Sequence, residues 1–240
     1  MQDNALIQPV NRKNLILSDP VLLISAEAEM HALINILDLK DIKKTKLITS
    51  KVYMGQRGGR SVSLIGPIIG APYAVLILEE IIAAGARQIL FVGRCGSLSE
   101  SVEIGHCIVP DGSYIDEGTS RCYPITSDIS YPDMGYSDEV FNICNQQGQM
   151  VHKGKIWCTD GLYQETPEKI EAYQRKNAIA VEMETSALFT VASYRNVSIS
   201  ALLIVSDHLY TLTWTNGLDS PAFKKGRTNI NQTVRMLVDK

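Results

Sequence analysis

The chain has 240 residues, of which 45% are hydrophobic and 20% are charged, enough for one sizeable core. Its formal net charge is −3, and no Lys/Arg-rich face or tail is present, which argues against a nucleic-acid partner. No apolar run approaches the roughly 20 residues that span a bilayer, and residues 1–19 lack the apolar core of a signal peptide. We therefore expect a cytoplasmic protein with no membrane partner.

Short apolar runs alternate with amphipathic stretches along the chain, a pattern typical of strands that alternate with helices. In chain order, the predicted strands span residues 21–24, 51–53, 62–65, 88–93, 103–114, 151–159 and 198–205. The predicted helices span residues 29–37, 72–85, 138–147, 166–175, 184–194 and 221–238. This order predicts a single domain over residues 1–240, with residues 1–19 as an N-terminal extension, folded as a three-layer α/β/α sandwich.

Turn and cap residues support these boundaries. The glycine-containing segment 55–59 joins two strands as a hairpin. Pro72 begins a helix that Gly85 ends, and Thr166 with Pro167 forms a cap and first turn for another. Cys95, Cys107 and Cys158 lie in or beside apolar strands, so we expect buried free thiols rather than disulfides. The four histidines show no metal-ligand spacing, and no metal is expected.

Carboxylates follow two apolar runs where packing gives no reason for them. Glu182 and Glu184 follow the run 178–181, and Asp207 follows the unbroken run 201–205. A carboxylate at the exit of a buried strand either caps a helix or takes part in chemistry. In open α/β sheets, ligands bind beyond the carboxyl ends of the strands, where Arg94 and Asp207 both fall.

The motif Val181-Glu182-Met183-Glu184, followed by Ser206-Asp207, resembles the nucleoside phosphorylase family of purine nucleoside phosphorylases, uridine phosphorylases and methylthioadenosine nucleosidases. Further matching segments occur in family order, at residues 66–72, 91–98, 104–110, 116–120 and 159–163. The resemblance covers roughly residues 20–210. It implies that family's α/β/α fold with a central mixed sheet, and a homo-oligomer with shared active sites.

The resemblance also implies an activity: cleavage of the N-glycosidic bond of a nucleoside with phosphate, giving free base and ribose 1-phosphate. Inorganic phosphate is the expected cosubstrate, and no other cofactor is expected. Asp207 matches the aspartate that interacts with purine N7, so a purine-like nucleoside is the expected substrate. A carboxylic acid in a partly dry pocket can protonate a departing base near neutral pH. The alternative for Asp207 is an N-cap on a following turn.

Ribose and base contacts are carried over from the same motifs. Glu184 matches the glutamate that accepts hydrogen bonds from the ribose diol, and Met183 the methionine packed under the sugar. Glu182 matches a less universal contact and has a structural alternative, an acidic first helical turn. Leu162 falls at the base-stacking position beside Tyr163. Arg227, in the final helix, matches an arginine that assists the aspartate in some purine phosphorylases.

The phosphate end departs from the family pattern. The first strand is followed by Ser25-Ala26-Glu27-Ala28-Glu29 in place of a Gly-Asp-Pro-x-Arg turn, and Glu29 matches the base that activates water in the nucleosidases. Arg94 stands three residues beyond the usual arginine, in a predicted turn with Gly93 whose N–H groups could hold an anion. We expect Arg94 to bind phosphate. Hydrolysis through Glu29-activated water, or a nucleoside-binding protein without turnover, are the alternatives.

Overall fold

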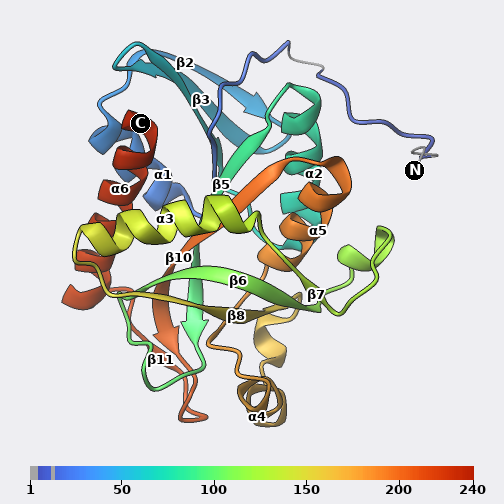
Figure 1. Cartoon of the computed structure of the whole chain (residues 1–240), viewed down its shortest axis with the longest axis vertical. Coiled ribbons are helices and arrows are strands. Elements are labelled where there is room, and N and C mark those ends of the chain that lie inside the picture. Colours follow the sequence, from blue (N-terminus) through green and yellow to red (C-terminus); the bar gives the residue numbers. More distant parts are fainter. Residues whose placement is uncertain (1–4, 12–13) are drawn as a thin grey trace.

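A mixed sheet of eleven strands lies at the centre of the computed structural model, which describes residues 5–11 and 14–240 (Figure 1). Its strands are β1 (Val21–Ile24), β2 (Lys40–Leu47), β3 (Ser50–Arg57), β4 (Arg60–Gly66), β5 (Gln88–Ser97), β6 (Cys107–Asp116), β7 (Ile129–Ser130), β8 (Val151–Thr159), β9 (Ala180–Glu182), β10 (Ser198–His208) and β11 (Thr215–Asn216). The helices are α1 (Glu27–Leu37), α2 (Ala71–Ala83), α3 (Met134–Gln146), α4 (Pro167–Arg175), α5 (Thr185–Arg195) and α6 (Pro221–Asp239). The predicted extension at residues 1–19 lies partly outside the described residues.

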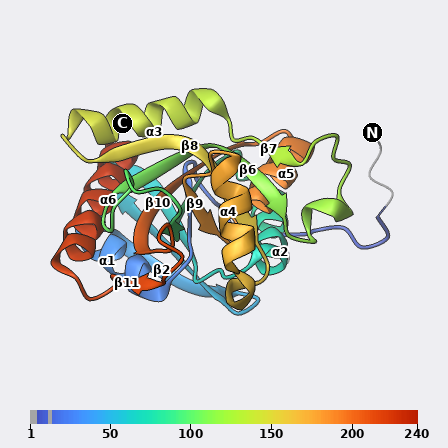
Figure 2. The ribbon, with the colours of Figure 1, turned by 90° about the horizontal axis from the view of Figure 1, so that it is seen from below.

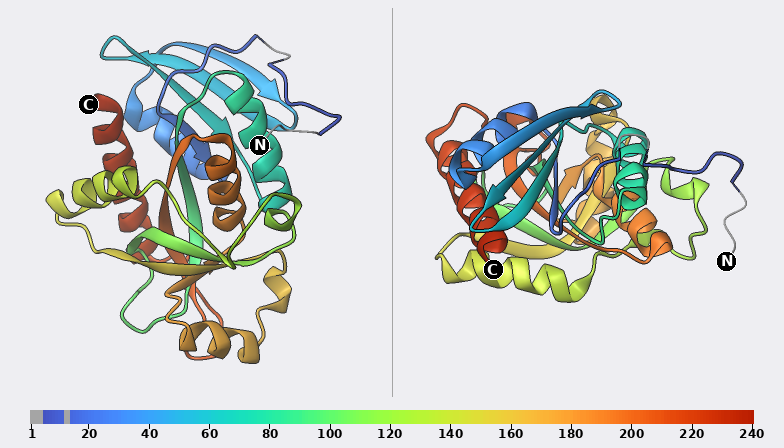
Figure 3. Two further views of the ribbon diagram at one scale, coloured as in Figure 1. Left: turned by 45° about the vertical axis from the view of Figure 1, so that its right-hand side comes forward. Right: turned by 90° about the horizontal axis from the view of Figure 1, so that it is seen from above.

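Two apolar cores flank the sheet, as a three-layer arrangement requires (Figure 2). Alternate residues of β1 point to opposite faces, so that Val21 and Leu23 join one core while Leu22 and Ile24 join the other. Helices α2 and α5 pack in the first core, and α1, α3 and α6 in the second. Helix α4 lies apart, at the opposite end of the molecule from the β2–β3 hairpin (Figure 3). The predicted sandwich with a central mixed sheet is confirmed.

Part of the sheet closes on itself. Strand β10 pairs in parallel with β5 and antiparallel with β6, and β6, β8, β9 and β5 are paired in that order. Five strands therefore form a ring, while β1, β4, β3 and β2 continue from β5 as an open sheet. The alternation of strands and helices did not predict this closure, because it depends on pairing between distant segments.

Most predicted elements are confirmed, but several boundaries were wrong. The predicted turn at Gly93–Arg94 is part of β5, which continues to Ser97 because β9 and β10 pair with its end. Strand β6 begins at Cys107 rather than at residue 103, and the lysine-rich strand β2 was missed. The hairpin of β3 and β4 is confirmed, with Gly58 and Gly59 at its turn.

The predictions about the cysteines and about the start of α4 can also be compared with the structure. All five cysteines are free, and all but Cys122 are buried. Thr166 caps α4, since its hydroxyl accepts a hydrogen bond from the Lys169 N–H. No helix within residues 5–11 and 14–240 has the length and apolar character needed to cross a membrane.

Candidate active site

A cavity of about 320 Å³ lies beyond the carboxyl ends of β1, β5, β9 and β10. This position is where open α/β sheets bind ligands, and the volume is at the lower end of the range for small-molecule sites. Among the predicted site residues, those that line the cavity are Arg94, Leu162, Glu182, Met183, Glu184 and Asp207. Its lining does not include Glu29, Gly93, Tyr163 or Arg227.

Gly96 of β5 brings the two acidic motifs together. It pairs with Val181 of β9 on one side and with Asp207 of β10 on the other. A Cβ atom at Gly96 would lie 2.5 Å from Leu209 Cδ1 and 3.1 Å from Asp207 Oδ2. The lack of a side chain at Gly96 thus allows the carboxylate of Asp207 to approach the strand. Segments more than twenty residues apart in the sequence thereby meet at one cavity.

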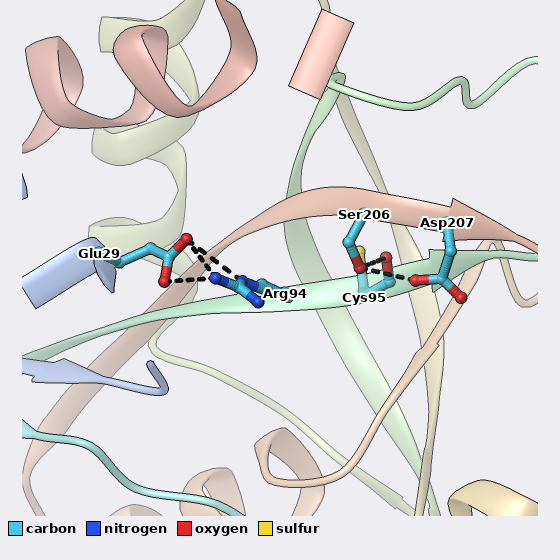
Figure 4. Close-up of polar contacts among 5 residues, drawn as sticks. All are labelled: Glu29, Arg94, Cys95, Ser206 and Asp207. Carbon is cyan, nitrogen blue, oxygen red and sulfur yellow. Dashed lines mark hydrogen bonds and ion pairs between the residues drawn. The ribbon is translucent and has the colours of Figure 1, made fainter. Parts of the chain in front are cut away.

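Hydrogen bonds fix both oxygens of Asp207. The Ser206 hydroxyl donates to Oδ1 at 2.6 Å (Figure 4). The Trp214 indole N–H donates to Oδ2 at 3.0 Å. The pairing register of β10 with β5 shifts between Val205 and Asp207, a strand irregularity of the kind often found beside active sites. Asp207 does not cap a helix, because it lies within β10. The cap alternative is therefore wrong.

The buried carboxylates Glu182 and Glu184 have different partners. Oε2 of Glu182 accepts from the N–H groups of Glu184 and Thr185, while Oε1 accepts from the Thr185 hydroxyl at 2.5 Å. Glu182 thus holds the first turn of α5. Glu184 accepts one hydrogen bond, from the Gly70 N–H at the start of α2, at 2.6 Å. Burial and the nearby charge of Glu182 raise the pKa of Glu184 to about 8.

Arg94 and Glu29 form an ion pair at the other end of the cavity. Arg94 Nη2 donates to both oxygens of Glu29, at 2.7 and 2.8 Å, and Nε donates to Oε1 at 3.2 Å (Figure 4). The guanidinium also lies 5.6 Å from the ring centre of Phe223. Glu29 is buried beneath the arginine, whose side chain stays 30% exposed. Nη1 of Arg94 has no partner among the described residues, so it is available to an anion.

The remaining predicted residues lie at the edge of the cavity, outside it, or within the packed core of the sheet. Leu162 borders the cavity, half exposed, and the neighbouring Tyr163 is 94% exposed. Gly93 is buried in β5 between Phe91 and Leu203, so it does not form the predicted anion-binding turn. Arg227 is on α6 and does not line the cavity.

Sequence reasoning missed two residues that line this cavity, Ser25 and Glu165. The Ser25 hydroxyl lines the cavity and is buried without a hydrogen-bond partner among the described residues. Glu165 lines the cavity with Asp207, and burial together with the Asp207 charge raises its pKa to about 7. Trp214 does not line the cavity, but its indole N–H donates to Asp207. Ser25 directly follows the first buried strand. Because ligands bind at the carboxyl ends of such strands, this position could have identified Ser25 as a candidate site residue.

Carboxylates, a single arginine and hydroxyls therefore surround the cavity. Across residues 5–11 and 14–240, no three His, Cys, Asp or Glu side chains are grouped as a metal site would require. At one end, Asp207 can exchange a proton or hydrogen bond with a heterocycle. At the other, Arg94 Nη1 and the Ser25 hydroxyl offer donors to an anion, and Glu184, which also lines the cavity, carries carboxyl oxygens that can accept from hydroxyl groups.

The chain is similar to known proteins over most of its length. The model of the family described as the phosphorylase superfamily matches residues 21–238. A guanosine phosphorylase from Halorubrum lacusprofundi is 26% identical over 191 residues, covering 79% of each chain. A purine nucleoside phosphorylase of the DeoD type from Buchnera aphidicola is 25% identical over 170 residues, covering 70% of this chain and 71% of the relative.

Solved structures share the fold at lower sequence identity. A uridine phosphorylase from Vibrio fischeri superposes with a TM-score of 0.82 at 20% identity, covering 99% of this chain and all of the other. A purine nucleoside phosphorylase from Toxoplasma gondii, in complex with immucillin-H, also gives a TM-score of 0.82, at 16% identity, covering 99% and 97%. At these identities the comparison shows the common fold.

Proposed function

The chain belongs to the phosphorylase superfamily, and on that premise we propose that it cleaves the N-glycosidic bond of a purine nucleoside with inorganic phosphate. The products are the free base and ribose 1-phosphate. The observation that carries this proposal is the single cavity that Asp207, Glu184 and Arg94 line together. These three groups can serve the base, the ribose and the phosphate, which are the three parts of the reaction.

Each group has a chemical task in this reaction. As the C1′–N9 bond breaks, negative charge develops on the base and positive charge on the ribose. Asp207 acts toward purine N7, and its fixed carboxyl limits the reorganisation needed at that point. The Glu184 carboxyl accepts a ribose hydroxyl, while Met183 lies at the same wall. Two phosphorylases named for purine nucleosides among the relatives support a purine.

We place phosphate at Arg94 Nη1 and the Ser25 hydroxyl. Both groups lie at the cavity and lack other partners among the described residues. Glu29 neutralises part of the arginine's charge, so the affinity for the phosphate dianion should be modest. No metal or organic cofactor enters this proposal.

Hydrolysis through Glu29-activated water finds less support in the geometry. Both oxygens of Glu29 accept hydrogen bonds from Arg94, and Glu29 does not line the cavity. Water activation would require the ion pair to open. The relatives and structural neighbours described above are phosphorylases.

We also propose a homo-oligomer in the cytoplasm. Ile69 lines the cavity while 67% exposed, and Tyr163 beside its mouth is 94% exposed. A second copy that covered these side chains would close the cavity and could complete the active site. Five free cysteines suit a reducing compartment. Sedimentation velocity, with and without nucleoside, would measure the oligomeric state.

The deciding experiment measures base release from purine and pyrimidine nucleosides, including 5′-methylthioadenosine, with and without phosphate. Phosphate-dependent release of purine with formation of ribose 1-phosphate is the expected result. Equal release without phosphate, giving free ribose, would instead establish a hydrolase. Nucleoside binding without any release would establish a binding protein that has lost turnover.

A further inference from the structure

Two histidines meet outside the cavity, where the neighbouring strands β6 and β8 begin (Figure 1). His106 Nδ1 lies 3.0 Å from His152 Nε2, and the centroids of the two rings are 5.1 Å apart. The N–H group of Glu103 donates a hydrogen bond to the same Nδ1 atom, at 3.1 Å. Both imidazoles are half-buried, and the proposed reaction gives neither of them a task.

These contacts determine which ring nitrogens carry protons. Because Nδ1 of His106 accepts from the Glu103 N–H, the proton of a neutral His106 ring is on Nε2. His152 then donates its Nε2 proton to the same acceptor. A proton added to Nδ1 of His106 would place a third donor between two existing donors. Protonation at this atom therefore requires that both hydrogen bonds break.

The surroundings favour the neutral form of both rings. Burial lowers the pKa of His106 below its ordinary value of 6.5, although the charge of Glu103 acts in the opposite direction. Burial and the charge of a protonated His106 lower the pKa of His152. Lys153, the next residue of β8, is paired with Asp138 of α3. The pair is thus a site at which acid changes both the charge and the hydrogen bonding.

The turn 103–106 also contacts the strand that carries Asp207. The Gly105 N–H donates to the Val205 carbonyl at 2.9 Å, and the Val205 N–H donates to the His106 carbonyl at 3.0 Å. The register of β10 on β5 shifts directly after Val205, before Asp207. The oxygens of Asp207 are engaged with neutral donors. The turn and the end of β10 therefore hold each other in position.

Helix α6 packs against the same turn. A Cβ atom at Gly226 would lie 2.2 Å from the Gly105 carbonyl oxygen, and one at Gly105 would lie 2.3 Å from the Ala222 carbonyl oxygen. These contacts bring no charge to the histidines. Phe223 of α6 places its ring 5.6 Å from the Arg94 guanidinium. The turn thus contacts elements that serve both ends of the cavity.

We propose that the His106–His152 pair is a pH-sensitive switch, which holds the turn 103–106 and the end of β10 in place at neutral pH and releases them in acid. Nδ1 of His106 takes a proton from solvent, both hydrogen bonds at this atom break, and the turn opens. Because the folded-state pKa lies below 6.5, the stabilisation is fully present above pH 6.5 and is lost as pH falls through the folded-state value. The effect on catalysis through Asp207 rests on the proposed function, whereas the opening of the turn does not.

The test compares amide hydrogen exchange in wild type and H106Q at pH 7.5 and pH 5. The amide oxygen of glutamine can accept the same two hydrogen bonds, but it does not titrate. The matched control is H31Q, because His31 is exposed on α1. In wild type, protection of the Gly105 and Val205 amides, corrected for intrinsic exchange, should fall by roughly 10-fold or more in acid, as a displacement of one pKa unit would produce. H106Q should keep its protection, and H31Q should match wild type.

Two further measurements complete the test. Nitrogen NMR of wild type at pH 7.5 should show His106 protonated at Nε2, and this readout needs no variant. With guanosine and saturating phosphate, the ratio of H106Q to wild-type kcat should rise between pH 7.5 and pH 5, because other titrations cancel in the ratio. Equal changes of protection in H106Q and wild type, or a proton on Nδ1 of His106 at pH 7.5, would overturn the switch. Loss of protection in wild type alone, without purine release by either protein, would support the switch and overturn the proposed function.

Discussion

Arg94 donates hydrogen bonds to both carboxylate oxygens of Glu29, at 2.7 and 2.8 Å, and thereby ties β5 to α1 at the phosphate end of the cavity. The positive charge that should attract phosphate is thus balanced by a buried negative charge. Phosphate binding then depends on the remaining Nη1 donor and on nearby hydroxyls. A substitution that removes the negative charge of Glu29 should therefore change the affinity for phosphate.

Glu29→Gln should lower the KM for phosphate by roughly 5-fold or more, because it removes a negative charge beside the dianion. Glutamine keeps an acceptor for Arg94, so kcat should stay within about 10-fold of wild type. Steady-state kinetics with varied phosphate measures this. The control is E27Q, since Glu27 lies on the same helix but is exposed and pairs with Lys51. Complete loss of base release in E29Q would point to Glu29 as the base of a hydrolase.

Asp207→Asn should reduce kcat by roughly 10²-fold or more, because asparagine cannot supply an acidic proton to the leaving base. Affinity for the free purine, measured by calorimetry, should change much less than the rate. The melting temperature serves as the control for folding. A kcat within 10-fold of wild type would remove Asp207 from the proposed mechanism.

Trp214→Phe should lower kcat/KM by roughly 3- to 10-fold, because the Asp207 carboxylate loses its indole donor at Oδ2. The ring's apolar bulk is largely kept, and Trp214 is 65% exposed, so the melting temperature should hardly change. Comparison of kinetics and thermal unfolding checks both parts. Unchanged kinetics would mean that the indole contact with Asp207 does not persist during turnover.

Gly96→Ala should disturb the site more than the fold. The added methyl group would lie 2.5 Å from Leu209 and 3.1 Å from the Asp207 carboxylate, which must move. We expect a loss of roughly 1–3 kcal/mol in unfolding free energy, as for other overpacked sites, and at least a 10-fold fall in kcat. G118A is a suitable control, because a Cβ at Gly118 would have its closest contact at 3.7 Å. Equal effects of the two substitutions would contradict the crowding at Asp207.

Glu184→Gln should stabilise the ligand-free protein in alkaline solution. The folded-state pKa of Glu184, about 8, lies above the usual 4.5, so its stability contribution is fully present below pH 4.5 and is lost as pH rises through 8. Glutamine does not titrate. The melting temperature of E184Q minus that of wild type should therefore increase between pH 5 and pH 8.5, by about 2–4 °C for each kcal/mol. A constant difference would contradict the raised pKa. E168Q provides the exposed comparison.

The sequence predicts elements well where the signal is local. Strand β8 has the predicted bounds, and α4 begins with the expected cap because Thr166 and Pro167 act within a single turn. Strand β2 was missed because it lies at the edge of the sheet and is rich in exposed lysines, so it lacks an alternating apolar pattern. The end of β5 was predicted as a turn because its pairing partners β9 and β10 are distant in sequence.

In the candidate site, too, the residues carried by local motifs were predicted, and those brought in by the tertiary structure were not. Asp207, Glu184 and Met183 were identified by motif, and they line one cavity. The roles assigned to these residues remain predictions. Glu165 carries no motif, and the structure places it at the cavity that Asp207 also lines. Arg227 was chosen by its position in the final helix, but it does not line the cavity.

The pairing of Gly96 with two strands distinguishes the part of the active site that the sheet fixes from the part that lies outside the sheet. The strands that carry Asp207 and Glu182 are neighbours of a single residue, so main-chain hydrogen bonds set the spacing of the reactive groups. The segment around Leu162, which borders the cavity, lies outside this pairing. Mutation and insertion in that segment can therefore alter the preferred nucleoside over evolutionary time without disturbing the reaction itself. A fold organised in this way favours divergence into many substrate specificities.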